Sequence, residues 1–192
     1  MRSSEIAMSF SGTFGPSALA TPSNFITLLR VIITPLLMYD VAKNGATWTA
    51  FIVWVVLAST DKLDGFLARK QGTTRSGAFL DPLADKLMVF GLFAVLVAKS
   101  EIWWLPVIIM AVRETWMSLY RSVLGRRGIS VPARPLGKAK TFVQIIAIGL
   151  ALIPGFYAFG RSEIAALVWI ATGLALVSGY FYYADGHVQG YN

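Results

Sequence analysis

The 192-residue chain is 56% hydrophobic, only 14% of its residues are charged, and its net charge is +7. Soluble domains carry about 25% charged residues, so this composition disfavours a soluble protein and favours one whose apolar surface faces lipid. The positive charge is typical of basic loops beside anionic headgroups, and nucleic acid is not expected as a partner. The absence of cysteine excludes disulfides, thiolate catalysis and cysteine-bound metals.

The two ends of the chain differ from its apolar middle. Residues 1–20 are rich in Ser and Gly and lack the basic start and apolar core of a signal peptide, so they are predicted to be a loosely ordered tail. Thr21 to Asn24 is typical of a cap before a first helix. Residues 186–192 are predicted to form a C-terminal tail. Residues 21–185 between the tails predict a single all-α domain.

Six apolar segments follow one another along that domain, and each approaches the ~20 residues that a helix needs to cross a bilayer. They predict a multi-pass integral membrane protein with six transmembrane helices in one bundle. Six spans place both termini on one side, and the two long basic loops, at about residues 69–75 and 126–138, lie on that side too. The positive-inside bias therefore predicts that the termini and the active site are cytoplasmic, at the cell (inner) membrane. The segments are 25–42, 46–66, 78–98, 102–123, 139–158 and 164–184.

Four aspartates lie where the second apolar segment ends and the third begins. An ionisable group near hydrocarbon costs about 2.5–3.5 kcal/mol on insertion scales, so these acids are expected to be functional. Asp61 and Asp64 are three residues apart, and Asp81 and Asp85 are four apart, so each pair shares a helix face. Carboxylates gathered at one membrane surface repel, so either several are protonated or a cation neutralises them. Oxygen ligands favour Mg²⁺ or Mn²⁺ over zinc.

Small and basic residues surround these acids. Gly65, Ala68 and Gly77 allow a ligand to approach the helix backbone closely. Arg69 supplies a planar fork that suits a phosphate. Acid pairs, a bound metal, an arginine and small residues together predict a pyrophosphate site.

The same residues resemble the CDP-alcohol phosphotransferase family. That family is marked by D-x-x-D-G-x-x-A-R and, after a short gap, G-x-x-x-D-x-x-x-D. The chain departs from the pattern once, because seven residues (70–76) separate the two halves where eight is usual. The motif is carried here by Asp61, Asp64, Gly65, Ala68, Arg69, Gly77, Asp81 and Asp85.

The resemblance implies a six-helix membrane enzyme, commonly a homodimer, that uses Mg²⁺ or Mn²⁺, with two ions in the site. Asp61, Asp64 and Asp81 would bind the metal ions, and Asp85 would contribute to one of them and act as the general base. The donor would be CDP-diacylglycerol. The residues implied to line its site are Asn24, Thr27, Gly65, Ala68, Arg69, Thr74 and Gly77.

Weaker similarities point to the phosphatidylglycerophosphate synthase branch of the family. The run from Ser23 to Arg30 looks like its P-N-x-x-T-x-x-R opening, with Ser23 in place of the proline. The Arg113-Glu114 pair, Arg121 and the run from Gly137 to Gln144 are also similar. This branch transfers a phosphatidyl group to glycerol 3-phosphate and releases CMP.

Four cations are candidates for binding a phosphate on the acceptor: Arg113, Arg121, Lys138 and Lys140. Such a pocket favours glycerol 3-phosphate over uncharged inositol or serine. Arg113 has an alternative role, because it can simply pair with Glu114 or with an aspartate of the site. Cardiolipin, phosphatidylinositol phosphate and phosphatidylserine synthases would share the aspartate motif, so the acceptor stays open. A cation channel or transporter is a more distant alternative, and it predicts acids near the bilayer midplane.

Overall fold

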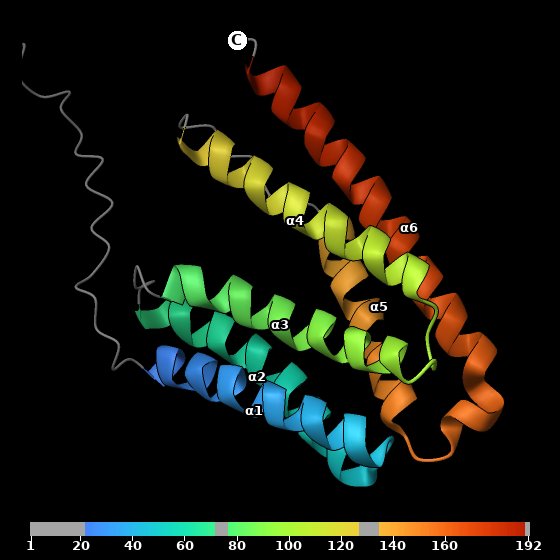
Figure 1. The fold of residues 1–192 in the computed structure, drawn as a ribbon. Helices are drawn as coiled ribbons and strands as arrows, with labels where there is room; N and C mark the ends of the chain where they lie inside the picture. The colour runs from blue at the N-terminus through green and yellow to red at the C-terminus, as the bar shows by residue number, and fades with distance from the viewer. Residues whose placement is uncertain (1–21, 72–76, 127–134, 191–192) are drawn as a thin grey trace, which may run out of the picture.

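The computed structural model describes residues 22–71, 77–126 and 135–190, with side chains for 25–60, 83–123 and 136–184. Every regular element in these ranges is an α-helix, so the predicted all-α class is confirmed (Figure 1). Proline opens two of the helices, where its fixed φ and missing N–H are tolerated. The helices are α1 (Pro22–Asn44), α2 (Trp48–Gln71), α3 (Gly77–Ala98), α4 (Trp104–Arg126), α5 (Pro135–Leu152) and α6 (Phe156–Gly190).

The helices associate in two groups that share one core. α1 packs extensively on α3 and touches α2, while α5 packs most extensively on α6 and α4 lies against α6 (Figure 1). Contacts of α5 with α2 and α3 join the groups. Trp54 of α2 is buried at this junction, and its indole N–H donates to the carbonyl of Ile145 at 3.1 Å. The core therefore runs through the middle of the bundle.

Small residues explain the close packing of α5 against α6. Ala147 and Ala151 lie one turn apart on α5, and Ala171 and Ala175 lie one turn apart on α6. All four are fully buried. Such small-residue faces let helix backbones approach closely, which is how helices associate where lipid removes the hydrophobic driving force.

Two of the described helices are long and apolar enough to cross a membrane. They are Phe25–Asn44, with 20 residues, and Phe156–Ala184, with 29. Large apolar side chains also project outward from the bundle, including Leu36 of α1 and Val112 of α4. Outward apolar side chains on a protein of this composition indicate that it faces lipid.

The turn between the last two helices lies earlier than the sequence predicts. The segments 139–158 and 164–184 place it near Gly160, but α5 ends at Leu152 and α6 begins at Phe156. Gly155, with φ of +76°, makes the turn directly after Pro154. Gly160 is instead a non-helical residue inside α6, with φ −102° and ψ 18°. α6 also continues to Gly190, through residues for which the sequence predicts a tail.

A hydrogen-bonded cap ends α3 and shapes the loop to α4. The N–H of Glu101 donates to the carbonyl of Leu96, and the N–H of Ser100 donates to that of Val97, both at 2.9 Å. Ser100 has a φ of +59°. This is the Schellman pattern, with serine at the position where glycine is usual. The loop is therefore held in one conformation by backbone bonds.

Candidate active site

The aspartate motif lies where α2 ends and α3 begins. Asp61 and Asp64 belong to α2, and Asp81 and Asp85 belong to α3. The intervening residues 72–76, including Thr74, lie outside the described residues. So do the side chains of 61–82 and the side chain of Asn24. The roles predicted for Asp61, Asp64, Gly65, Ala68, Arg69, Gly77 and Asp81 therefore stay predictions, and Asp85 is the acid of the motif whose side chain the structure describes.

Asp85 is held by an arginine that the motif does not contain. Its Oδ1 accepts a hydrogen bond of 2.8 Å from Nη1 of Arg30 in α1. The Arg30 side chain is 1% exposed and that of Asp85 is 41% exposed. A buried guanidinium needs a carboxylate partner in an apolar helix bundle. The ion pair therefore fixes Asp85 in place while leaving part of its carboxyl group accessible.

Thr27 lies on the same face of α1 as Arg30, one turn earlier, and is fully buried. Both belong to the opening run that resembles phosphatidylglycerophosphate synthases. The contact of Thr27 with CDP-diacylglycerol stays a prediction. Arg30 received no role from the sequence, although a lone cation inside an apolar segment is a signal that could have singled it out.

The donor set at this end of the bundle fits a hard divalent cation. Asp85 offers carboxylate oxygens in a half-exposed position, and the other motif acids are carboxylates as well. Mg²⁺ and Mn²⁺ prefer such oxygen ligands. Among the described residues no group of three His, Cys, Asp or Glu side chains gathers in one place. Asp85 is thus the described part of the predicted metal site, and the other predicted ligands lie outside the described side chains.

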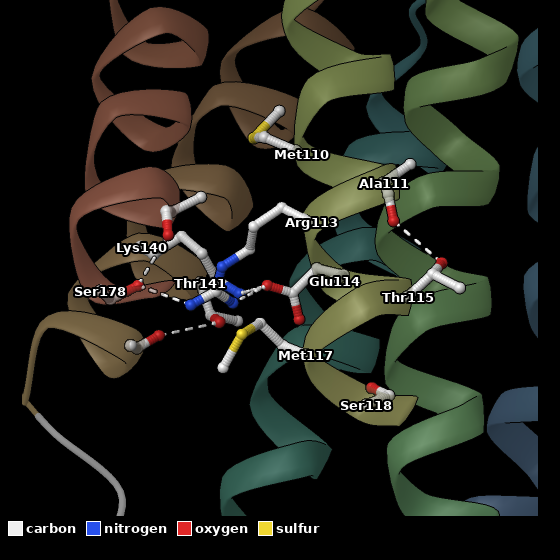
Figure 2. A network of polar contacts seen from close by, with 12 residues as sticks. Met110, Ala111, Arg113, Glu114, Thr115, Met117, Ser118, Lys140, Thr141 and Ser178 are labelled. Carbon is white, nitrogen blue, oxygen red and sulfur yellow. Dashed lines mark hydrogen bonds and ion pairs between the residues drawn. The ribbon is translucent and has the colours of Figure 1, made fainter. Parts of the chain in front are cut away.

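A second polar cluster joins α4, α5 and α6 (Figure 2). Glu114 of α4 accepts bonds from Arg113 and from Lys140 of α5 through the same oxygen, Oε1. Arg113 also donates from Nη2 to the hydroxyl of Ser178 in α6 at 2.9 Å. Glu114 and Lys140 are buried. The predicted pairing of Arg113 with Glu114 is confirmed, and Lys140 shares the same carboxylate.

A glycine makes room for this cluster. A Cβ on Gly179 of α6 would lie 3.0 Å from Nε of Arg113. That Nε is buried and has no hydrogen-bond partner within the described part of the chain. An orphaned buried donor keeps hydrogen-bonding capacity that an anionic ligand can use.

Lys86 extends the cluster towards Asp85, its neighbour on α3. Its ammonium donates to the hydroxyl of Ser118 on α4. Charge–charge interactions link Lys86 to Glu114 and Arg121, and Lys140 to Arg113 and Arg121. Lys86, Arg113 and Lys140 interact with Glu114, and Arg121 is close enough to Lys86 and Lys140 to repel them, so the cluster carries excess positive charge. We call these four cations with Glu114 the basic cluster.

The structure thus brings together three of the four cations predicted for the acceptor phosphate. Arg121 lies over the ring of Tyr182, 5.7 Å from its centroid, and its Nε donates to the carbonyl of Met117 at 3.4 Å. Lys138 is exposed, and none of its interactions within the described residues places it with the other three. Lys86 was missed by the sequence reasoning, although a lysine inside an apolar segment, next to a motif acid, is a usable signal.

Comparison with known proteins places this geometry in a family. The model of the CDP-alcohol phosphatidyltransferase family matches residues 20–188. A protein of Mycobacterium tuberculosis (strain H37Rv) named probable phosphatidylglycerophosphate synthase is 36% identical over 165 residues, covering 82% of this chain and 77% of that protein. A CDP-diacylglycerol–glycerol-3-phosphate 3-phosphatidyltransferase of Rickettsia bellii is 32% identical over 168 residues, covering 83% and 92%. One of that name from Escherichia coli (strain K12) is 38% identical over 135 residues, covering 66% and 74%. The family match spans the aspartate motif and the basic cluster alike, and the chain belongs to the CDP-alcohol phosphatidyltransferase family.

Proposed function

We propose that this protein transfers a phosphatidyl group from CDP-diacylglycerol to glycerol 3-phosphate, giving phosphatidylglycerophosphate and CMP. The family match supports the transfer chemistry, and the names of the relatives support this donor and acceptor. The main observation that supports the proposal is that Asp85 and Lys86 are consecutive residues of α3. Asp85 belongs to the aspartate motif, which would hold the donor, and Lys86 belongs to the basic cluster, which suits an acceptor with its own phosphate.

The basic cluster favours a charged acceptor. The four cations of the cluster outnumber Glu114, its one carboxylate, and a phosphate dianion would neutralise the remaining positive charge. The orphaned Nε of Arg113 adds a buried donor. Inositol carries no anion, and serine carries a carboxylate that is offset by its own ammonium, so neither would supply a phosphate to these cations, and buried unpaired charges are costly.

Asp85 is the proposed general base. Its side chain is 41% exposed, so an acceptor hydroxyl can reach it, and Arg30 holds it in position. It would take the proton from the hydroxyl of glycerol 3-phosphate as that oxygen attacks the β-phosphorus of CDP-diacylglycerol. Asp61, Asp64, Asp81 and Asp85 would hold the two divalent ions. When bound, Mg²⁺ or Mn²⁺ would offset the negative charge that develops on the pyrophosphate. CMP leaves without a covalent enzyme intermediate.

The proposal includes a membrane arrangement. Family members generally depend on a divalent metal and work on membrane lipids. All six helices would cross the inner membrane, with both termini and the aspartate motif on the cytoplasmic side, as the basic loops predict. The protein would act as a homodimer, as the family resemblance implies. The acyl chains of the donor would stay in lipid while its CDP group enters from the cytoplasm.

Release of CMP by the purified protein tests the acceptor. With CDP-diacylglycerol and Mg²⁺ or Mn²⁺, glycerol 3-phosphate is expected to support faster CMP release than inositol phosphate, serine or phosphatidylglycerol, because it is the smallest of these acceptors that carries a phosphate for the basic cluster. Chelation by EDTA should abolish release with every acceptor. Faster release with another acceptor would keep the transfer reaction and reject glycerol 3-phosphate as the substrate.

Lys86→Met is expected to raise the KM for glycerol 3-phosphate by about 10-fold or more, because one charge-assisted hydrogen bond to phosphate contributes about 1.5–3 kcal/mol. The KM for CDP-diacylglycerol should change little. The exposed Lys138 on α5 provides the matched control, and Lys138→Met should leave both constants near their wild-type values because it lies outside the basic cluster. An unchanged KM for glycerol 3-phosphate in Lys86→Met would remove Lys86 from the acceptor site.

A further inference from the structure

A cavity of about 370 Å³ lies at the opposite end of the bundle from Asp85. The loop between α3 and α4 forms one side and the start of α6 forms the other (Figure 1). Asp85 and Val97, which lines the cavity, are both on α3, and twelve residues of helix separate them by about 18 Å. The cavity is therefore distinct from the transferase site. Its size falls within the range of about 300–1,000 Å³ that is usual for small-ligand sites.

The walls of this cavity are fixed by side-chain contacts. The hydroxyl of Tyr157 in α6 donates to the carbonyl of Ser100 at 3.2 Å, which ties α6 to the capped α3–α4 loop. Arg161 lies over the ring of Tyr157, 5.6 Å from its centroid. The rings of Trp103 in the loop and Trp169 in α6 lie at a tilt of 58° with their centroids 5.8 Å apart. The cavity is thus held open by a preformed frame.

Two opposite charges line the cavity without pairing to each other. Glu101 and Arg161 both contribute to its lining. Within the described part of the chain, no ion pair involves either side chain. Burial raises the pKa of the Glu101 carboxyl above its usual value, and the nearby Lys99 partly opposes this. A half-buried carboxylate and a guanidinium in one cavity are complementary to a ligand that carries both a cation and an anion.

The remaining lining indicates the kind of ligand. Trp103, Trp104 and Trp169 are exposed at the rim, as tryptophans are at the level of lipid headgroups. Ile102 and Val168 are buried and form an apolar floor. A rim of tryptophans, an apolar floor and two separated charges suit the headgroup end of a phospholipid better than a freely soluble metabolite.

We propose that this cavity binds the headgroup of a zwitterionic phospholipid of the phosphoethanolamine type, in the leaflet opposite to the transferase site. Arg161 would bind the phosphate, and Glu101 would accept hydrogen bonds from the primary ammonium. An anionic glycerol headgroup offers no ammonium to Glu101, so the site discriminates by headgroup charge. The proposal rests on membrane insertion of the bundle and is independent of the transfer reaction.

Native mass spectrometry of the detergent-purified protein tests this site. The protein is incubated with equal amounts of phosphatidylethanolamine and phosphatidylglycerol that carry the same acyl chains. Wild type is expected to retain phosphatidylethanolamine about tenfold over phosphatidylglycerol, because phosphatidylethanolamine adds one charge-assisted hydrogen bond from its ammonium to Glu101. Glu101→Gln should remove that preference, and Arg161→Gln should lower retention of phosphatidylethanolamine by a similar factor.

The controls lie at the same end of the bundle. Lys99→Gln changes a basic residue of the same loop that does not line the cavity, and Glu163→Gln changes an exposed acid of α6. Glu163→Gln should bind lipid as wild type does, whereas Lys99→Gln removes a positive charge that acts on Glu101 and should not weaken retention of phosphatidylethanolamine through Arg161. Equal retention of the two lipids by wild type, or an effect of Lys99→Gln as large as that of Arg161→Gln, would overturn the proposal.

Discussion

Asp85→Asn is expected to reduce CMP release by about 10²–10⁴-fold, the range over which a positioned general base contributes to catalysis. Asparagine has the size of aspartate but cannot take a proton from the acceptor hydroxyl. Its amide oxygen can still accept the hydrogen bond that Arg30 makes to Asp85 at 2.8 Å. The measurement is the initial rate of CMP release at saturating CDP-diacylglycerol and glycerol 3-phosphate.

The buried Arg30 complicates this variant, because the change also removes the negative charge beside it. Combining Asp85→Asn with Arg30→Gln replaces the ion pair by two amides and should restore thermal stability towards that of wild type. The double variant is still expected to be inactive. Asp40→Asn, at the other end of α1, is the matched control and should retain full activity. Activity within about threefold of wild type in Asp85→Asn would reject the base assignment.

Glu114→Leu is expected to lower the free energy of unfolding by about 3–5 kcal/mol, the usual cost of leaving a buried charge without its partner. Glu114 is the carboxylate that both Arg113 and Lys140 contact. The change would strand two cations between α4, α5 and α6. Denaturant titration in detergent, followed by circular dichroism, measures the loss. Glu163→Gln, an exposed acid of α6, should change stability by less than about 0.5 kcal/mol.

A double variant that removes a cation together with Glu114 distinguishes the effect on the free energy of unfolding from the effect on binding of glycerol 3-phosphate. The double variant Glu114→Leu with Lys140→Met has one fewer unpaired buried charge than Glu114→Leu alone. It should therefore recover part of the stability that the single variant loses. It should not recover the affinity for glycerol 3-phosphate, because Lys140 is a proposed phosphate ligand. An unfolding free energy unchanged in Glu114→Leu would show that the contacts of Glu114 contribute nothing to folding.

The order and type of the helices could be predicted from sequence, because Pro, Gly and polar residues interrupt the apolar runs. The α5–α6 turn could not be placed correctly. The polar run beginning at Gly160 is the stronger break in hydropathy, yet Pro154 and Gly155 make the turn. A kinked helix tolerates polar residues near a membrane surface, so hydropathy alone does not distinguish a kink from a chain reversal.

Site residues could be predicted where a short sequence motif contains them. Contacts between helices could not be predicted, because they depend on how each helix is rotated about its axis. Asp85 follows from the spacing of the aspartate motif. Its contact with Arg30 spans 55 residues and depends on how α1 packs on α3. Likewise, Glu114 could have faced either lysine at the start of α5, and the structure shows that it takes Lys140 and leaves Lys138 exposed. Helices that are apolar all round carry little sequence information on which side faces which neighbour.

The position of Arg30 in the chain also affects how the protein is made. Arg30 leaves the ribosome 55 residues before Asp85. At about 5–20 residues per second, α1 exists for roughly 3–11 s before its carboxylate partner is synthesised. During this interval an arginine in an apolar helix disfavours insertion by about 2.5–3.5 kcal/mol. The charge of Arg30 therefore stays without Asp85 until α3 is made, so the packing of α1 on α3 and the placement of Asp85 are completed in the same step.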